Sequence, residues 1–366
     1  MRRCESCESA APDRSELPEY SNRVVIKMEQ LGELIFRLCG APGVAGEEAP
    51  VLRAAAEELK KYASVHTDAL GNLTAEMGKK DAKEHVLLDA HLDQIGLIVT
   101  RIDDEGFLHV DQCGGVDRRV LPGSPVTVLG RETLRGIVCC TPPHLAGDNE
   151  GKVLPVEKMA VDVGLSEEEA RRLVFPGDRI LFYSRPKKLL GTKISAAGLD
   201  DRAGVAALIR CAQLLSEEEL DCRLTILCST REETGGQGAV TGAYLAAPTQ
   251  AVAVDVSFAL QPDVPEENCG KLGGGPMIGV APVLDRAMGE KLFAIARRLK
   301  MPHKADVMGG KTGTNGDEIA VSRSGVRTAL ISIPLRYMHT PAEVIDLRDV
   351  EYTAELLAEY IREAEV

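Results

Sequence analysis

Histidine and carboxylate residues follow several apolar segments of this chain, at the points where those segments end. His91 and Asp93 come directly after the run VLLDA, and Asp255 ends the run AVAV. Similar positions elsewhere hold Asp200 and Asp201 after KISAAGL, Glu232 and Glu233 after LTILCSTR, and His339 after ALISIPLRYM. Because ligands of open α/β sheets bind beyond the carboxyl ends of the strands, these residues predict one shared polar site.

Imidazole nitrogens and carboxylate oxygens together form a ligand set that zinc, cobalt or manganese accepts. Two histidines with three or four carboxylates exceed the needs of one tetrahedral ion, but they suit two ions that share a bridging carboxylate and activate a water molecule. Taken singly, His91 could be a hydrogen-bonded core histidine and Asp200 a helix N-cap. Glu232 and Glu233 could begin a solvated helix, and His339 could cap the last one. The combination favours a metal site, because buried charges need partners.

The segments around these residues predict an α/β domain. Apolar residues at helical spacing predict helices at 28–39 and 47–62, and the apolar run 85–91 predicts a buried strand. Residues 65–77 read as a hairpin-like pair of strands. From residue 189 onwards, strand and helix patterns alternate, which is typical of a mostly parallel sheet covered by helices on both faces.

The pattern between these parts is different. Short β-like runs broken by Gly and Pro predict a small β-barrel or sandwich, and Ser166 with Glu169 forms a capping-box spacing at one short helix. Because the α/β pattern resumes afterwards, we expect an inserted β domain at 104–188. The catalytic α/β domain would then consist of 24–103 and 189–366.

Charge and hydropathy exclude several classes of protein. The 366 residues include 43 Lys and Arg against 56 Asp and Glu, a net charge of −13, which repels phosphate backbones and disfavours nucleic acid as a partner. We find no apolar core of a signal peptide and no run approaching the ~20 residues of a membrane span. The sequence therefore predicts a cytoplasmic protein without a membrane partner, and the polar residues 1–23 predict a disordered extension.

The ten cysteines fit the same compartment. Most lie inside apolar runs, for example Cys139, Cys140 and Cys228, and predict buried reduced thiols. Cys4 and Cys7 form the one CxxC pair, which is a weak metal or redox signal without a second pair.

Five polar segments occur in a definite order along the chain. They are AHLDQIGL (90–97), GLDDRAG (198–204), REETGGQGA (231–239), VAVDVS (252–257) and RYMHTP (336–341). Together with GIVCCTPPHL (136–145), they resemble the tetrahedral aminopeptidases over about residues 30–360. That family of dinuclear metallo-aminopeptidases includes glutamyl and deblocking aminopeptidases, some formerly labelled endoglucanases. The resemblance implies a zinc-exopeptidase-like α/β fold with an inserted barrel, and removal of residues from the free amino ends of short peptides.

The resemblance also implies which residues would hold the metal ions. His91, Asp200 and Asp255 would bind one ion, while Asp200, Glu233 and His339 would bind the second, with Asp200 bridging the two. Zinc or cobalt would be the expected metal, with manganese as an alternative.

Three further features follow from the same resemblance. Glu232 would act as the general base, because successive residues at a strand-to-helix turn point in different directions and Glu233 is used as a ligand. Asp93 would lie behind His91 and fix its tautomer. A cis peptide bond is expected after Asp200.

Two segments depart from the family pattern, and other functions stay open. Gln94 replaces an acidic residue of many relatives, and residues 309–319 are less regular than usual. A deacylase or carboxypeptidase could use the same scaffold, and a non-catalytic scaffold is a further alternative. The inserted β domain favours the aminopeptidase, and the histidines argue against a metal-free glycosidase. The resemblance also implies a homo-oligomer, commonly of twelve subunits.

Overall fold

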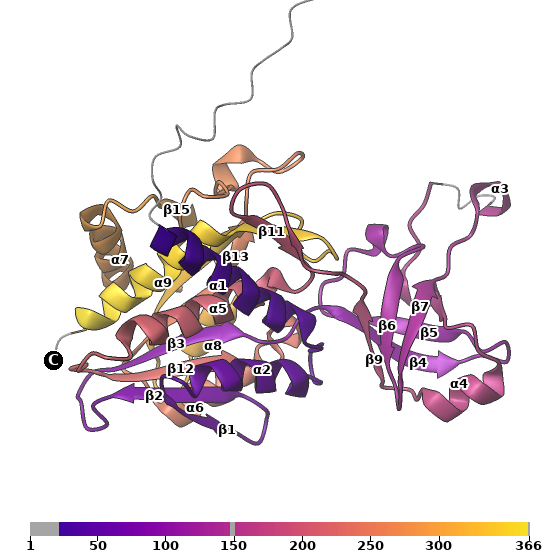
Figure 1. Ribbon diagram of the computed structural model, residues 1–366, viewed down its shortest axis with the longest axis horizontal. Helices are drawn as coiled ribbons and strands as arrows, with labels where there is room; N and C mark the ends of the chain where they lie inside the picture. The colour runs from indigo at the N-terminus through magenta and orange to yellow at the C-terminus, as the bar shows by residue number, and fades with distance from the viewer. Residues whose placement is uncertain (1–21, 147–150, 365–366) are drawn as a thin grey trace, which may run out of the picture.

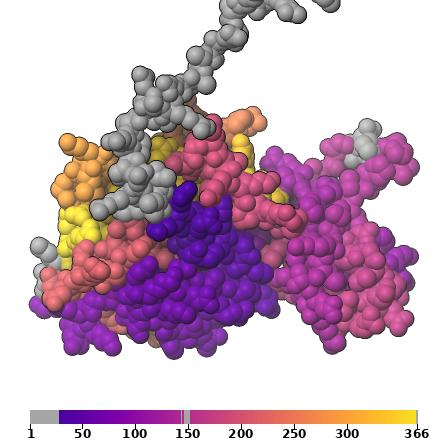
Figure 2. Space-filling view, in the orientation of Figure 1, coloured from indigo at the N-terminus to yellow at the C-terminus, as the bar shows by residue number. Residues whose placement is uncertain are grey.

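The computed structural model describes residues 22–146 and 151–364. The predicted disordered extension therefore lies almost entirely outside the described residues, and so do Cys4 and Cys7. Figure 1 shows a larger α/β body and a smaller barrel that projects from one side of it, and the space-filling view in Figure 2 shows the same two parts in contact.

A mixed eight-stranded sheet forms the centre of the α/β body, in the order β1-β2-β12-β3-β13-β16-β14-β15. The strands are β1 Ser64–Thr67, β2 Leu73–Gly78, β3 His85–His91, β12 Arg223–Ser229, β13 Gln250–Phe258, β14 Met277–Val280, β15 Lys304–Val307 and β16 Arg327–Leu335. The four central strands, β12, β3, β13 and β16, pair in parallel. This confirms the prediction of a mostly parallel sheet, and the antiparallel pair of β1 with β2 confirms the predicted hairpin.

Helices cover both faces of this sheet. They are α1 Asn22–Gly40, α2 Ala49–Leu59, α5 Leu199–Leu215, α6 Gln237–Ala246, α7 Arg286–Arg298, α8 Asn315–Ala320 and α9 Leu347–Arg362. Alternate residues of β3 face opposite layers, as strand geometry requires. Val86 and Leu88 join the core under α1, α2, α5, α7 and α9, whereas Leu87 packs with α6 and α8. Every residue of β3 is buried, which explains why its middle, Val86–Leu88, is apolar on both faces.

The inserted part is a closed six-stranded barrel in the cyclic order β4-β5-β8-β7-β6-β9. Its strands are β4 Gly96–Ile102, β5 Leu108–Cys113, β6 Pro125–Leu129, β7 Thr133–Val138, β8 Ala160–Asp162 and β9 Arg179–Phe182, with helices α3 Pro143–Ala146 and α4 Glu167–Leu173 beside them. The capping box of Ser166 and Glu169 is present at α4. Strand β4 begins at Gly96, before the start expected for the inserted domain at residue 104. The domain limits themselves stay a prediction.

A small three-stranded sheet joins two distant parts of the α/β body. It consists of β10 Lys187–Lys188, β11 Lys193–Ala196 and β17 Glu343–Asp346. Ala196 in β11 pairs with Glu343 in β17. The segment that returns from the barrel therefore lies beside the segment that follows His339.

The eight cysteines within the described ranges are all free thiols. Cys228 is buried as expected, but Cys139 is half-buried and Cys140 is exposed, because both follow the end of β7. Among the described residues, none of the helices is both long and apolar enough to cross a membrane.

Candidate metal centre

The candidate site lies at the carboxyl ends of the parallel strands. His91 is the last residue of β3, Asp255 lies in the second half of β13, and the turn after β12 carries Glu232 and Glu233. His339 follows β16, and Asp200 begins α5 after the return from the barrel. The structure thus brings together all of the residues that the strand-end pattern singled out.

Two groups of potential ligand atoms share Asp200. One oxygen or nitrogen from each of His91, Asp200 and Asp255 lies within 4.8 Å of the others, and the same holds for Asp200, Glu233 and His339. His91 Nε2 lies 3.2 Å from Asp200 Oδ1, while His339 Nε2 lies 3.3 Å from Asp200 Oδ2. Each oxygen of Asp200 therefore faces a different imidazole, which is the arrangement that a bridging carboxylate needs.

The electrostatics of the cluster favour added positive charge. Burial raises the pKa of Asp255 and of Glu233, since their ionised forms are poorly solvated. Burial also opposes ionisation of Asp200, but hydrogen bonds from His339 and His91 outweigh it and lower the pKa of that carboxyl. Within the described part of the chain, Glu233 Oε1 is buried without a hydrogen-bond partner. A buried carboxylate oxygen without a hydrogen-bond donor is suited to bind a cation.

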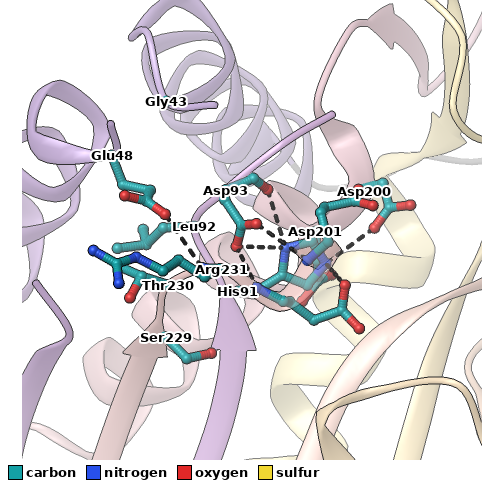
Figure 3. A network of polar contacts seen from close by, with 12 residues as sticks. Gly43, Glu48, His91, Leu92, Asp93, Asp200, Asp201, Ser229, Thr230 and Arg231 are labelled. Carbon is teal, nitrogen blue, oxygen red and sulfur yellow. Dashed lines mark hydrogen bonds and ion pairs between the residues drawn. The ribbon is translucent and has the colours of Figure 1, made fainter. Parts of the chain in front are cut away.

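Asp93 lies beside His91, as Figure 3 shows, and it also contacts the glutamate pair. The backbone carbonyl of Asp93 lies 3.0 Å from His91 Nδ1. Because a carbonyl only accepts, Nδ1 carries a proton and Nε2 faces Asp200. The carboxylate is 3.5 Å from Nδ1 and instead accepts the backbone N–H groups of Glu232 (3.0 Å) and Glu233 (3.2 Å). The backbone of Asp93 thus orients His91, and its carboxylate fixes the turn that carries the glutamates.

Glu232 lies at the edge of the same cluster. Its Oε2 lies 3.9 Å from His91 Nε2. Burial raises the pKa of Glu232, with the charges of Asp200 and Asp93 acting in the same direction and the neighbouring histidines opposing them. The peptide bond between Asp200 and Asp201 is cis, as we expected.

Glu343 is a site residue that sequence reasoning missed. It is buried, and its carboxylate accepts the backbone N–H groups of Leu199 (2.8 Å), Asp200 (3.4 Å) and His339 (3.1 Å). It therefore holds the backbone of two candidate ligands that are far apart in sequence. Its one sequence signal is a position four residues after His339, which by itself resembles the start of an ordinary strand.

The two departures from the family pattern lie close to this centre. Gln94 is buried, and a Cβ on Gly198 would lie only 2.1 Å from its side-chain oxygen. Asn315, in the irregular segment, donates to Asp89 Oδ2 (2.8 Å) and to Ser229 Oγ (2.9 Å). Gln94 therefore packs against the start of α5, whereas Asn315 links the ends of β3 and β12 behind the site.

Comparisons with known proteins agree with the fold and place the chain in a family. Residues 71–356 match the family described as M42 glutamyl aminopeptidase. A lysyl aminopeptidase of Pyrococcus furiosus is 33% identical over 339 residues, which cover 90% of this chain and 96% of the relative. An aminopeptidase structure from Desulfurococcus kamchatkensis is 34% identical with a TM-score of 0.86, covering 93% of this chain and 96% of that one. The TET1 peptidase of Pyrococcus horikoshii, which can assemble into a tetrahedron or a large octahedral shell, is 32% identical with a TM-score of 0.81, covering 91% and 99%.

Proposed function

Because the chain belongs to the M42 glutamyl aminopeptidase family, we propose that its activity depends on two divalent metal ions held at the shared Asp200. The chain is a hydrolase of peptide bonds and an aminopeptidase. The observation that supports two ions is the pair of donor groups in which each oxygen of Asp200 faces a different histidine.

We assign the ligands from the two donor groups. His91, Asp200 and Asp255 would hold the first ion, and Asp200, Glu233 and His339 would hold the second. When bound, such paired ions would lower the pKa of a water molecule and polarise the peptide carbonyl. Imidazole with carboxylate suits zinc or cobalt, and manganese is compatible with the same set.

The remaining steps belong to side chains of this chain. Glu232 accepts a proton from the water as its oxygen bonds to the peptide carbonyl carbon and the C=O electron pair moves onto the carbonyl oxygen. Glu232 then passes the proton to the nitrogen of the leaving amine as the C=O bond is restored and the peptide C–N bond breaks. A pKa raised by burial makes this carboxylate a stronger proton acceptor than an exposed one. Asp93 keeps the base and the adjacent ligand Glu233 in place through their backbone N–H groups.

We propose short peptides with a free amino end as substrates and a closed homo-oligomer as the working assembly. Support comes from the family and from the assemblies described for the Pyrococcus horikoshii relative. Twelve subunits stay a prediction, which light scattering at working concentration tests and a monomer would contradict. The relatives' names include both glutamyl and lysyl preferences, so no single side-chain preference is carried over.

The decisive experiment uses one peptide in free and N-acetylated forms. Metal-free protein is supplied with zinc or cobalt, and the products are followed by mass spectrometry. We expect stepwise loss of residues from the free form alone, and only with metal. Removal of the acetyl group would indicate a deacylase, and trimming from the other end a carboxypeptidase. Absence of turnover with either metal would indicate a non-catalytic scaffold.

A matched pair of variants tests the role of the base. Glu232→Gln should retain both ions but lose about 10²–10⁴-fold in kcat, because general base catalysis is removed. Glu47→Gln changes an exposed glutamate outside the cluster and should match the wild type. Wild-type kcat in Glu232→Gln would contradict the assignment.

A further inference from the structure

A turn of the barrel reaches the second donor group. Strand β5 ends at Cys113, and the next residues, Gly114 and Gly115, lie against Glu233 and His339. The carbonyl oxygen of Gly115 is 2.8 Å from His339 Nδ1. Since that oxygen only accepts, it places a proton on Nδ1 and turns Nε2 towards Asp200.

The glycine at position 115 is explained by this contact. A Cβ added there would lie 2.8 Å from His339 Nδ1 and 3.0 Å from His339 Cε1. The backbone of Gly115 is not in the left-handed region, so its conformation does not require glycine. Gly114 lies against the other ligand candidate, since its Cβ would lie 3.1 Å from Glu233 Cβ. The turn is therefore packed directly against two candidate ligands of the second ion.

His339 needs such support. Its φ of 62° lies in the left-handed region, which costs a non-glycine residue about 1 kcal/mol or more. Glu343 accepts its N–H, Gly115 accepts its imidazole proton, and Asp117 donates its backbone N–H to the His339 carbonyl at 3.5 Å. Two of these three contacts come from the barrel.

The barrel packs against the α/β body near this turn. Cys113 and Leu181 of the barrel pack with Val44 and Ala45 of the α1–α2 loop. Arg179 in β9 donates from Nε to the Ala45 carbonyl at 3.1 Å. The turn at Gly114 and Gly115 thus leaves a strand whose end is fixed against the α/β body.

We propose that the Gly114–Gly115 turn is a positioning element for the second donor group, so that the barrel is required to bind the second ion but not the first. This inference rests on the proposed function. Within the described ranges, His91, Asp200 and Asp255 form their hydrogen bonds inside the α/β body. The first group therefore lacks the dependence that the second group has.

The test compares cobalt binding by three full-length proteins, followed by absorbance as Co²⁺ is added to metal-free samples. Gly115→Ala should leave the affinity for the first ion unchanged and weaken the second about 10–100-fold, the usual effect of disturbing a group behind a ligand. Gly40→Ala is the matched control, because its Cβ would have no atom within 4 Å. Wild-type affinity for both ions in Gly115→Ala would overturn the proposal.

Two further measurements keep the result decisive. Arg179→Leu loosens the docking without touching His339, so it should weaken the second ion alone, and it decides the matter if Gly115→Ala does not fold. If the wild type binds fewer than two ions, the proposed function fails instead. A crystal structure of metal-free Gly115→Ala then tests the turn itself. A His339 Nδ1 more than 3.5 Å from the Gly115 carbonyl would support it, and an unchanged contact would overturn it.

Discussion

Replacing Arg202 by Met should destabilise the protein strongly, although Arg202 is not a candidate ligand. The side chain is fully buried beside Asp201. It donates to four backbone carbonyls: those of Leu92 (3.3 Å), Leu38 (2.8 Å), Ala41 (2.8 Å) and Gly43 (3.3 Å). Leu92 lies between His91 and Asp93, so the same guanidinium holds the end of β3 and the α1–α2 loop together.

The magnitude follows from the acceptors that would lose their donor. Two of the four carbonyls keep another donor, since Leu38 accepts the backbone N–H of Ala41 and Gly43 accepts that of Gln94. The carbonyls of Leu92 and Ala41 lose theirs. An unsatisfied buried acceptor costs about 1–3 kcal/mol, so these two set a scale of about 4 kcal/mol. Removal of the buried charge offsets part of this loss of stability, because desolvating the guanidinium is itself unfavourable to folding. We therefore expect a loss of about 3 kcal/mol in the free energy of unfolding for Arg202→Met. Arg202→Lys should lose less, since an ammonium group can still donate to up to three carbonyls.

Urea unfolding at one fixed protein concentration measures this effect, because assembly would otherwise shift the apparent stability. Arg286→Met is the control, since the Arg286 side chain is 92% exposed and surface changes are usually worth less than about 0.5 kcal/mol. A loss below about 1 kcal/mol in Arg202→Met would refute the reasoning that the carbonyls of Leu92 and Ala41 depend on Arg202 for a hydrogen bond.

Three other substitutions test separate parts of the structure. Asp255→Asn should abolish binding of one ion while the second donor group still binds, which metal analysis after desalting would show. Glu343→Gln should lower activity about 10–100-fold, because an amide cannot accept on both sides to hold Asp200 and His339, and kinetics with a control at equal metal content checks this. Burial raises the pKa of Asp349 to about 7, so the folded chain keeps that proton to higher pH than the unfolded chain. Stability should therefore fall as pH rises from about 4 to 7, and Asp349→Asn should flatten that fall in thermal unfolding.

The ligand candidates could be predicted because they lie where short-range patterns are strong. His91 ends a fully buried strand, and Asp255 interrupts another, so a polar residue there contradicts its apolar surroundings. Such conflicts mark functional sites. The mostly parallel sheet was predictable for the same reason, since strands buried on both faces read as unbroken apolar runs.

The groups that hold these ligands could not be predicted from local pattern. Glu343 and Arg202 act on backbone groups of segments that are remote in sequence, and a backbone N–H or carbonyl leaves no trace in the residue type. The Gly115 carbonyl is the extreme case, because any residue supplies one. The prediction that Cys140 is buried was wrong for a related reason, because the apolar run in the sequence continues past the point where β7 ends.

The way in which the barrel interrupts the α/β body has a consequence for the order of folding. His91 and Asp200 are 109 residues apart, and closing so long a loop in an unfolded chain is entropically costly and slow. In the barrel, however, Leu97 pairs with Ile180, so its two ends are neighbours. If the barrel folds first, its neighbouring ends shorten the effective loop between His91 and Asp200. We therefore expect barrel formation to precede pairing of the central strands, with the ligand cluster among the last parts of the molecule to form.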